Sequence, residues 1–397
     1  MTKGREAMTT AAEAPEHHGS HRNLLWALDD PPPPSSAVDA IIVPTARPPA
    51  HLTRAAHLAR SLDCPLVTLH SGRWTSAREA AERLAAGVDL MAIDIPEPAR
   101  LRLPELETSG QLTGTIFARR SDLSPKRNIA LVLSRMLDWS RVIFIDDDIT
   151  DLDPGDMRRA AGLLDTHCAV GLTIEGFPDN SVVCHAFRDA GGEQQAFIGG
   201  GALAVEVGRN HSFFPDVYND DWFYLLEPKT GLQPVATAGR VTQQPYDPFR
   251  NPDRARAEEF GDVLAEGIYW LLDQGRAVAD ADLGHWAGYL GTRKRFVTRV
   301  LRLVADQPLD AAEKARRIAA LKGALGRLAL ITPARCHEYL RAWTADRDSW
   351  QRHIQQTPTG LTRARALDSL SRRGTAPLTW HASDALGLGS RRPVSAR

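Results

Sequence analysis

The stretch VIFIDDD, residues 142–148 of this 397-residue chain, decides how the fold is interpreted. Four consecutive apolar residues of high β propensity predict a buried strand, and three carboxylates follow where it ends. Ligands of open α/β sheets bind at the carboxyl ends of the strands. Side chains two residues apart in an extended chain point the same way, so we expect Asp146 and Asp148 to converge on one hard cation, with Asp147 facing elsewhere. The alternative is a solvated turn after a strand.

Alternating strands and helices precede this stretch. Short apolar runs of strand character alternate with segments whose apolar residues have helical spacing. This order predicts an α/β fold with a mostly parallel, doubly wound sheet flanked by helices. The strands are expected at 40–43, 65–70 and 88–95, and the helices at 51–62, 76–86 and 126–137.

The second half of the chain has a looser pattern. Strands are predicted at 169–174 and 202–205, and helical spacing returns over 254–272 and 311–347. The first residues are polar and end in a proline run, and the last are rich in Arg, Ser and Gly. We therefore expect a disordered leader (1–36), a folded α/β domain (37–275), a helical C-terminal extension (276–356) and a flexible tail (357–397).

The composition excludes several classes of protein. Lys and Arg number 48 against 49 Asp and Glu, a net charge of -1, which argues against a dedicated nucleic-acid binder. The four cysteines are widely scattered and form neither a CxxC pair nor a disulfide framework, which indicates a reducing compartment. No stretch is apolar enough to span a membrane, and the N-terminus lacks the apolar core of a signal peptide. We expect a cytoplasmic protein.

A basic segment, SPKRN at 124–128, stands at the predicted start of the helix before the Asp-tipped strand. Ser124 is a candidate N-cap, and Pro125 suits the first helical position. Helix N-termini attract phosphate, whereas the helix dipole disfavours the cations Lys126 and Arg127 there. An anionic ligand would explain both features, and an ordinary exposed basic turn is the alternative.

Two further segments have the composition of a site. Asp220 and Asp221 lie among aromatic residues in FFPDVYNDDW (213–222), and an apolar setting raises a carboxyl pKa toward the range of a general base. The alternative is a capped helix start. The glycine run 199–201 would let the backbone approach a ligand closely, although a tight turn needs the same residues.

The order of these segments resembles that of GT-A-fold glycosyltransferases of the family-2 type, over residues 38–272. Pro44 and Thr45, at the end of the first strand, are similar to the nucleotide-binding opening of that family. Arg127-Asn128 is similar to its common Arg-Asn pair, and residues 146–148 stand in the place of its DxD motif. The order is also similar to that of enzymes that transfer glucose or mannose to glycerate-type acceptors.

The resemblance implies a metal-dependent mode of donor binding. Asp146 and Asp148 would hold Mg²⁺ or Mn²⁺ on the diphosphate of a UDP- or GDP-type sugar, and the metal would stabilise the leaving nucleoside diphosphate. Arg127 would add positive charge at that phosphate. The substrate-binding residues so implied are Pro44, Thr45, Arg127, Asn128, Asp147, Gly200 and Gly201.

The resemblance also implies an acceptor side. The glycine-rich segment resembles the acceptor-side strand of the family, and NDDW (219–222) resembles the acidic segment that supplies the base of inverting members. Asp221, or its neighbour Asp220, would then deprotonate an acceptor hydroxyl. The paired aspartates favour inversion, although the glycerate-acceptor enzymes retain configuration.

The chain departs from the family at two points. Many members carry an Asp after the second strand to read uracil, whereas this chain has His70 there, and Asp94 is the alternative. A third metal ligand, often a late His, is not marked by a motif. His185, His211 and His285 are the candidates.

Two other functions remain open from the sequence. Asp146, Asp148 and Thr150 fit the DxDxT pattern of haloacid-dehalogenase-type phosphatases, with Asp146 as nucleophile and Asp148 as acid/base. Those enzymes usually carry the motif on the first strand, whereas here three predicted strands precede it. A non-catalytic nucleotide-sugar-binding protein is the second alternative.

Overall fold

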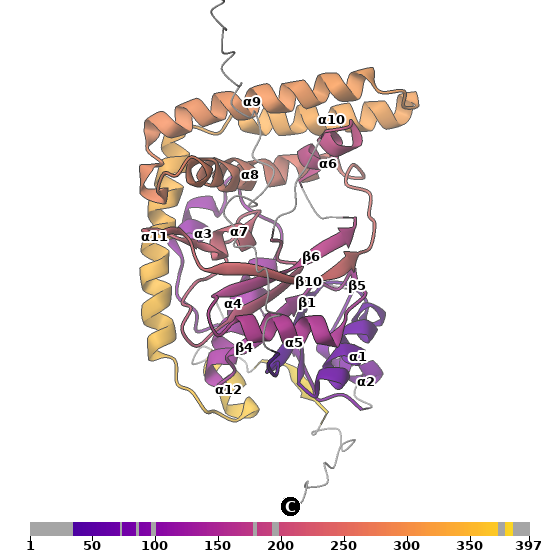
Figure 1. Ribbon diagram of the computed structural model, residues 1–397, viewed down its shortest axis with the longest axis vertical. Coiled ribbons are helices and arrows are strands. Elements are labelled where there is room, and N and C mark those ends of the chain that lie inside the picture. The colour runs from indigo at the N-terminus through magenta and orange to yellow at the C-terminus, as the bar shows by residue number, and fades with distance from the viewer. Residues whose placement is uncertain are drawn as a thin grey trace, which may run out of the picture.

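A mixed nine-stranded sheet forms the centre of the molecule in this computed structural model, which describes residues 35–71, 74–84, 87–96, 101–177, 181–192, 198–371 and 378–383 (Figure 1). Its strands are β1 (Ala40–Thr45), β2 (Leu66–His70), β3 (Leu90–Asp94), β4 (Arg141–Ile145), β5 (Ile149–Thr150), β6 (Ala169–Gly176), β7 (Ala202–Glu206), β10 (Val235–Gln243) and β11 (Trp380–Ala382). The order is β11-β3-β2-β1-β4-β7-β6-β10-β5, and β8 (Leu226–Glu227) pairs separately with β9 (Gly231–Leu232).

Most strands of this sheet run in one direction. The strands β1 to β4 pair in parallel, and β6 pairs in parallel with β10. Because β7 is antiparallel to both β4 and β6, all six of these strands point the same way. Only β5, β7 and β11 run in the opposite direction within the sheet. The predicted α/β class with a mostly parallel sheet is confirmed.

Helices cover both faces of the sheet, as its near-continuous apolar strands require. On one face, α1 (Thr53–Leu62), α2 (Ala77–Leu84) and α5 (Pro154–Leu163) bury their apolar residues against the sheet. On the other face, α4 (Leu123–Met136) contributes to a larger core. The remaining short helices are η2 (Pro49–Leu52), α3 (Glu107–Leu112), α6 (Val182–Asp189), α7 (Asp220–Tyr224) and η4 (Val278–Asp280).

Long helices follow the sheet in the sequence and form the upper layer and one flank in Figure 1. The helical character predicted over 311–347 is present but interrupted, because the chain breaks at the Thr332 N-cap, whose hydroxyl accepts a hydrogen bond from the N–H of Arg335. Two helices therefore occupy this stretch. The long helices are α8 (Pro252–Asp273), α9 (Leu283–Asp306), α10 (Ala311–Leu328) and α11 (Pro333–Gln356).

Two described segments, 363–370 and 380–382, are ordered elements packed on the fold, whereas the sequence predicts a flexible tail over 357–397. Helix α12 (Arg363–Leu370) buries Leu367 and Leu370, and β11 pairs antiparallel with β3 at the edge of the sheet. Arg363 donates two hydrogen bonds to the carboxylate of Asp89, at 2.6 and 2.7 Å. These elements are not predicted from the sequence because the few apolar residues that they bury stand in a segment of polar composition. Residues 372–377 and 384–397 of this segment, and residues 1–34 of the predicted leader, lie outside the described residues.

Among the described helices, none combines the length and the apolar character needed to cross a membrane.

Candidate functional site

The predicted site residues gather where the strand order reverses. The chain passes from β1 outward to β2 and β3, and then returns to β4 on the other side of β1. Thr45 ends β1, and Asp146 follows the last residue of β4. Such a switch point, at the carboxyl ends of parallel strands, is where open α/β sheets bind ligands.

The three aspartates form a tight turn and not an extended segment. The N–H of Ile149 donates to the carbonyl of Asp146 at 3.1 Å, so Asp147 and Asp148 are the central residues of a β-turn. The expected convergence of Asp146 with Asp148 is therefore not observed. The alternation of side chains along an extended strand, on which it rested, ends with the strand at Ile145. Instead, Asp147 and Asp148 share one cation, and Asp146 has another.

Arg47 is the cation shared by Asp147 and Asp148. Its guanidinium lies 3.1 Å from a carboxylate oxygen of each. Thr45 Oγ1 donates to the other oxygen of Asp147 at 2.5 Å. Burial raises the pKa of Asp147, while Thr45 and Arg47 act in the opposite direction. The side chain of Arg47 is 43% exposed, so this ion pair lies at the surface of the site. A lone Arg after a strand gave no signal of this role in the sequence.

Arg127 is a buried link between the two predicted halves of the site. Its guanidinium lies 3.4 Å from an oxygen of Asp146 and 3.3 Å from an oxygen of Asp220, and it donates to the carbonyl of Gly200 at 2.9 Å. It also lies over the ring of Phe214, 5.3 Å from its centroid. The side chain is 3% exposed. One cation thus neutralises a candidate metal ligand and a candidate base.

The helix that carries Arg127 begins earlier than expected. Helix α4 starts at Leu123, so Ser124 and Pro125 lie inside it, and Ser124 Oγ donates to Asp220 at 2.8 Å. Lys126 and Arg127 are both buried, which rules out the exposed basic turn. Lys126 Nζ donates to the carbonyl of Thr45 at 2.7 Å, and burial lowers its pKa.

Two of the predicted substrate-binding residues, Asn128 and Pro44, are buried in contacts within the protein. The Asn128 amide donates to the carbonyl of Phe214 and accepts from its N–H, both at 2.8 Å. Pro44 is buried within β1. Asn128 therefore holds the segment that leads to Asp220, and no contact of its side chain points to a ligand.

The paired aspartates Asp220 and Asp221 have different surroundings. Asp220 is buried beside Arg127, with Arg119 at 3.6 Å as a second cation. Asp221 instead accepts a hydrogen bond from the N–H of Gly200 at 2.5 Å. Burial raises the pKa of Asp221 to about 6, with a further rise from Asp220 that Arg127 opposes. Asp221 is thus the carboxyl of the pair with the properties of a base.

Asp216 is a site residue that the sequence analysis left without a role. Burial raises its pKa to about 6, and Arg119 opposes this shift. Its Oδ1 atom is buried and has no hydrogen-bond partner in the described part of the chain. The only sequence signal was its place in the same aromatic run as Asp220.

The glycine run lies against Arg127. A Cβ atom on Gly200 would lie 2.7 Å from both terminal guanidinium nitrogens of Arg127, so a side chain there would force Arg127 to shift. The Gly201 carbonyl accepts from the N–H of Asp146 at 2.9 Å. These two glycines therefore connect Arg127, Asp146 and Asp221, and the need for close backbone approach explains the run.

Replacing Gly200 with Ala is expected to displace the Arg127 guanidinium and to lower the free energy of unfolding by about 1–3 kcal/mol through overpacking. Urea unfolding measures the change. Gly326→Ala is the matched control: this glycine in α10 has no neighbour within 4 Å of an added Cβ, so the control should gain up to about 1 kcal/mol. Equal losses in both variants would contradict the close contact.

Helices α8 and α9 support the turn that carries Asp220 and Asp221. Asn219, in the left-handed conformation with φ 63°, donates to Asp262 of α8 at 3.0 Å, and Arg293 of α9 donates to Asp262 at 2.7 Å. Tyr269 donates to the carbonyl of Trp222 at 2.9 Å. The long helices thus hold both ends of α7, a dependence that nothing in the local sequence indicates.

The histidines suggested by the sequence do not contact the aspartate turn within the described residues. His185 lies 3.0 Å from the Tyr246 hydroxyl, and burial lowers its pKa to about 3. Burial also lowers the pKa of His211, beside Glu206, and that of His285, beside Trp286. None of the three is placed as a third ligand.

The two residues considered for base recognition are used internally. His70 is buried between the hydroxyls of Thr68 and Thr75, each 2.8 Å away, and burial lowers its pKa to about 4. Asp94 accepts from the N–H of Ala77 at 2.7 Å and so caps α2.

The donor atoms of the aspartate turn fit a hard cation in part. The described residues contain no group of three or more His, Cys, Asp or Glu placed to hold a metal. Mg²⁺ is often bound by one or two carboxylates plus substrate phosphates, so Asp146 and Asp148 supply the right oxygen chemistry. Arg47 pairs with Asp148 here, and it would have to move for a cation to bind.

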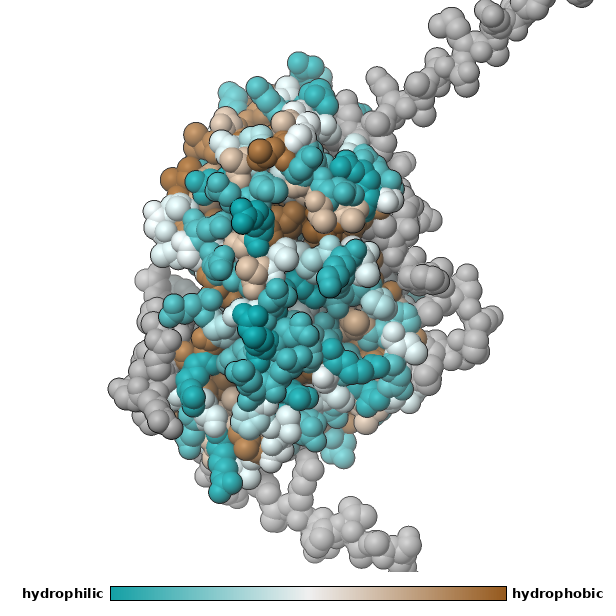
Figure 2. Space-filling view, turned by 90° about the vertical axis from the view of Figure 1, so that its left-hand side faces the viewer, coloured by the Kyte–Doolittle hydropathy of each residue, from teal (hydrophilic) through white to brown (hydrophobic). Residues whose placement is uncertain are grey.

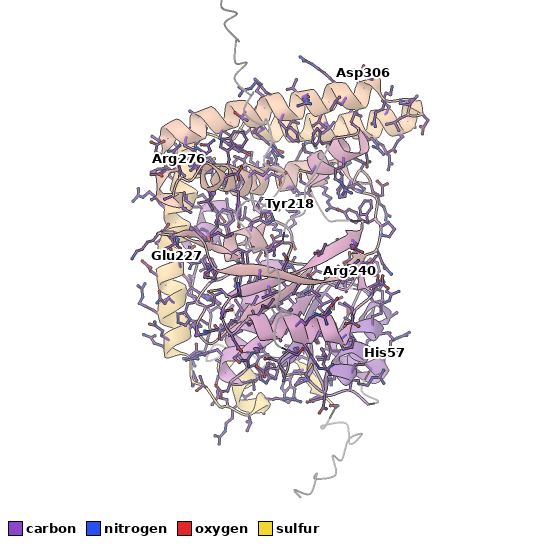
Figure 3. The ribbon with its side chains drawn as sticks, in the orientation of Figure 1. His57, Tyr218, Glu227, Arg240, Arg276 and Asp306 are labelled. Atoms are coloured by element: carbon purple, nitrogen blue, oxygen red, sulfur yellow. The ribbon has the colours of Figure 1, made fainter. Side chains whose placement is uncertain are left out.

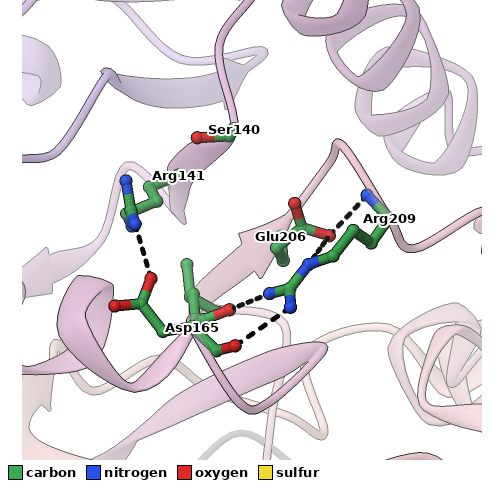
Figure 4. Close-up of a pocket in the computed structure, with 6 residues that line it drawn as sticks. Ser140, Arg141, Asp165, Glu206 and Arg209 are labelled. Carbon is green, nitrogen blue, oxygen red and sulfur yellow. Dashed lines mark hydrogen bonds and ion pairs between the residues drawn. The ribbon is translucent and has the colours of Figure 1, made fainter.

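A separate hollow of about 330 Å³ lies near the opposite end of β4 (Figure 4). Arg141 pairs with Asp165 at 2.5 Å, and Arg209 donates to the carbonyls of Leu164 and Asp165. The cations of this hollow are neutralised or bound by protein groups, so it does not compete with the site at the switch point.

A scan against protein-family models finds no match for this chain, and a search of curated proteins finds no similar sequence.

Proposed function

We propose that the protein is a metal-dependent glycosyltransferase that moves a sugar from a nucleotide-diphosphate sugar to a hydroxyl acceptor. The observation that carries the proposal is the position of Arg127, which is buried between Asp146 and Asp220 at the switch point of the sheet. Arg127 fixes positive charge between Asp146, the candidate metal ligand, and Asp220, the neighbour of the candidate base Asp221. Fixed charge of this kind is what a charged donor and a deprotonated acceptor need. The family resemblance of the motif order supports the same activity.

The donor half of the proposal uses the aspartate turn. Asp146 and Asp148 would hold Mg²⁺ or Mn²⁺, which when bound neutralises charge on the leaving nucleoside diphosphate. Asp147 stays held by Thr45, which keeps the turn at the end of β1. Arg47 is released from Asp148 as the donor binds, and its exposed guanidinium is then available to the diphosphate.

The acceptor half of the proposal uses Asp221. Its carboxylate accepts the proton of the acceptor hydroxyl while that oxygen bonds to the anomeric carbon and the bond from this carbon to the diphosphate breaks, so the product is inverted. The N–H of Gly200 holds the carboxylate in place. Asp220 lies between Arg127 and Arg119 and positions Arg127.

The rate is expected to depend on pH through Asp221. Because its pKa is about 6 and a base acts only when ionised, kcat/KM should rise about tenfold per pH unit below pH 6 and level off above it. A pH series of initial rates measures this limb. Asp221→Asn should remove it together with the activity, whereas the exposed Asp165→Asn should leave the profile unchanged.

Trp74 is expected to stack on the nucleobase. It is 63% exposed and lies four residues after His70, the register partner of Thr45 at the end of β1. Trp74→Ala should weaken nucleoside diphosphate binding about tenfold, within the range measured for stacking of bases on aromatic side chains. Trp74→Phe should retain most of the affinity, and titration calorimetry compares the two. Equal affinity of Trp74→Ala and wild type would remove Trp74 from the site.

The proposal is tested by incubating the protein with a panel of UDP- and GDP-sugars in Mn²⁺ and measuring release of nucleoside diphosphate. We expect slow release with one donor, with water as acceptor, and its loss in Asp221→Asn. Binding of a nucleotide sugar without release would favour the non-catalytic alternative. Hydrolysis of a phosphate monoester such as p-nitrophenyl phosphate, lost in Thr150→Val, would favour the phosphatase.

A further inference from the structure

Helix α9 presents an exposed face that carries only positive charge. No Asp or Glu occurs from Leu283 to Ala305, and Lys294, Arg295, Arg299 and Arg302 are all exposed. These four side chains, here named the basic face, recur at spacings that place them on one side of a helix. The buried Arg293 of the same helix is matched by three carboxylates, whereas the four cations of the basic face are exposed.

The basic face belongs to a strongly charged part of the molecule. Residues 283–328, which span α9 and α10, contain ten Lys or Arg and three Asp or Glu, a net charge of +7, whereas the whole chain carries -1. Lys294, Arg295 and Arg302 form no ion pair with a described residue. Figure 1 shows α9 along the upper end of the molecule, and Figure 3 places Asp306, its last residue, at the outer corner. The basic face is therefore an outer surface.

Apolar side chains border the other end of this surface. Leu283, the first residue of α9, is 53% exposed, and Leu330, just after α10, is 55% exposed. Because α10 runs back along α9, the end of α10 returns toward the start of α9. Figure 2, which views the left-hand side of Figure 1, shows hydrophobic residues gathered near the top, bordered by hydrophilic ones.

We propose that the basic face, with Leu283 and Leu330, docks on a membrane surface that contains anionic phospholipids. Cations attract anionic headgroups, and exposed apolar side chains enter the headgroup–acyl boundary, which is the usual combination for interfacial binding. A nucleic acid fits less well, since single strands need exposed aromatic rings and the aromatic residues Trp286, Tyr289 and Phe296 of α9 are buried. The inference is independent of the proposed transferase activity.

The test is co-sedimentation of the full-length protein with large vesicles. We expect binding to vesicles of phosphatidylcholine with phosphatidylglycerol, little binding to phosphatidylcholine alone, and release by 0.5 M salt because headgroup attraction is screened. The variant K294Q/R295Q/R299Q/R302Q should bind about 10²–10³-fold more weakly, since each cation near an anionic surface contributes about fivefold. Leu283→Ser should weaken binding further.

The control variant R54Q/R83Q/R352Q/R365Q removes four exposed cations elsewhere and should bind as wild type does. Thermal unfolding of each variant checks that the fold is retained. The proposal would be overturned if wild type did not bind the vesicles that contain phosphatidylglycerol. It would also be overturned if wild type and the α9 variant bound them equally. Loss of duplex DNA binding in the α9 variant without any vesicle binding would assign the face to a nucleic acid instead. Loss of self-association, again without vesicle binding, would assign it to a second copy of the chain.

Discussion

Arg127→Met is expected to lower the free energy of unfolding by about 3–5 kcal/mol and to abolish binding of a nucleoside diphosphate. The substitution removes the cation that Asp146, Asp220 and the Gly200 carbonyl share in a buried position. A buried carboxylate left without its partner costs about this much. Arg119 lies 3.6 Å from Asp220 and offsets only part of the loss.

Two further variants separate charge from geometry at this position. Arg127→Lys keeps the charge but loses the fork that reaches two carboxylates, so it should recover stability only in part. Arg120→Met removes an exposed arginine nearby in the sequence and should change stability by less than about 0.5 kcal/mol. Chemical unfolding compares all three. An Arg127→Met protein as stable as wild type would refute the link between the two halves of the site.

Arg293→Met is expected to be about as destabilising, by about 3–5 kcal/mol. Arg293 is buried and lies 2.7–3.0 Å from carboxylate oxygens of Glu259, Asp262 and Glu266. Burial raises the pKa of Glu259 to about 7 and that of Asp262 to about 6, and Arg293 is the cation that opposes both shifts. Without it, three buried carboxylates would face one another.

The same shifts give the stability of the protein a direction with pH. The folded-state pKa values of Glu259 and Asp262 lie above the value of about 4 for an unfolded chain, so the folded state binds more protons between about pH 4 and pH 7. Stability therefore falls as pH rises through this window. Arg293→Met should raise both pKa values further and extend the fall above pH 7.

Urea unfolding of Arg293→Met at pH 5 and pH 8 measures this effect. The loss relative to wild type should be larger at pH 8, where the carboxylates must ionise without their partner. Arg295→Met is the matched control, because this arginine lies two residues away on the exposed side of α9. A loss of equal size at both pH values would show that packing, and not charge, makes Arg293 important.

The position of the site could be predicted from the sequence because it depends on local patterns. The apolar run before Asp146 and the alternation of strands and helices are enough to place three carboxylates at the end of a central strand. The direction in which Asp147 and Asp148 point could not be predicted, since a β-turn replaces the period of two beyond Ile145. Local sequence patterns thus predict where the aspartates lie in the fold but not which residues their side chains contact.

Contacts between distant segments explain the remaining differences. Arg47 has no motif around it, and only the pairing of β1 with β4 brings it to Asp147. Asn219 depends on Asp262, 43 residues later, and β11 joins β3 from a polar terminal segment. Such contacts follow from tertiary packing, which a single sequence does not encode in any local period.

Titration of a nucleoside diphosphate into wild type and Asp148→Asn, each with and without Mn²⁺, tests the central claim most directly. The claim is that the aspartate turn beside Arg127 binds a metal–diphosphate. We expect wild type to bind one nucleoside diphosphate at least tenfold more tightly with Mn²⁺, and Asp148→Asn to lose this dependence while its circular dichroism stays unchanged. Absence of binding by folded wild type, or equal Mn²⁺ dependence in both proteins, would contradict the claim.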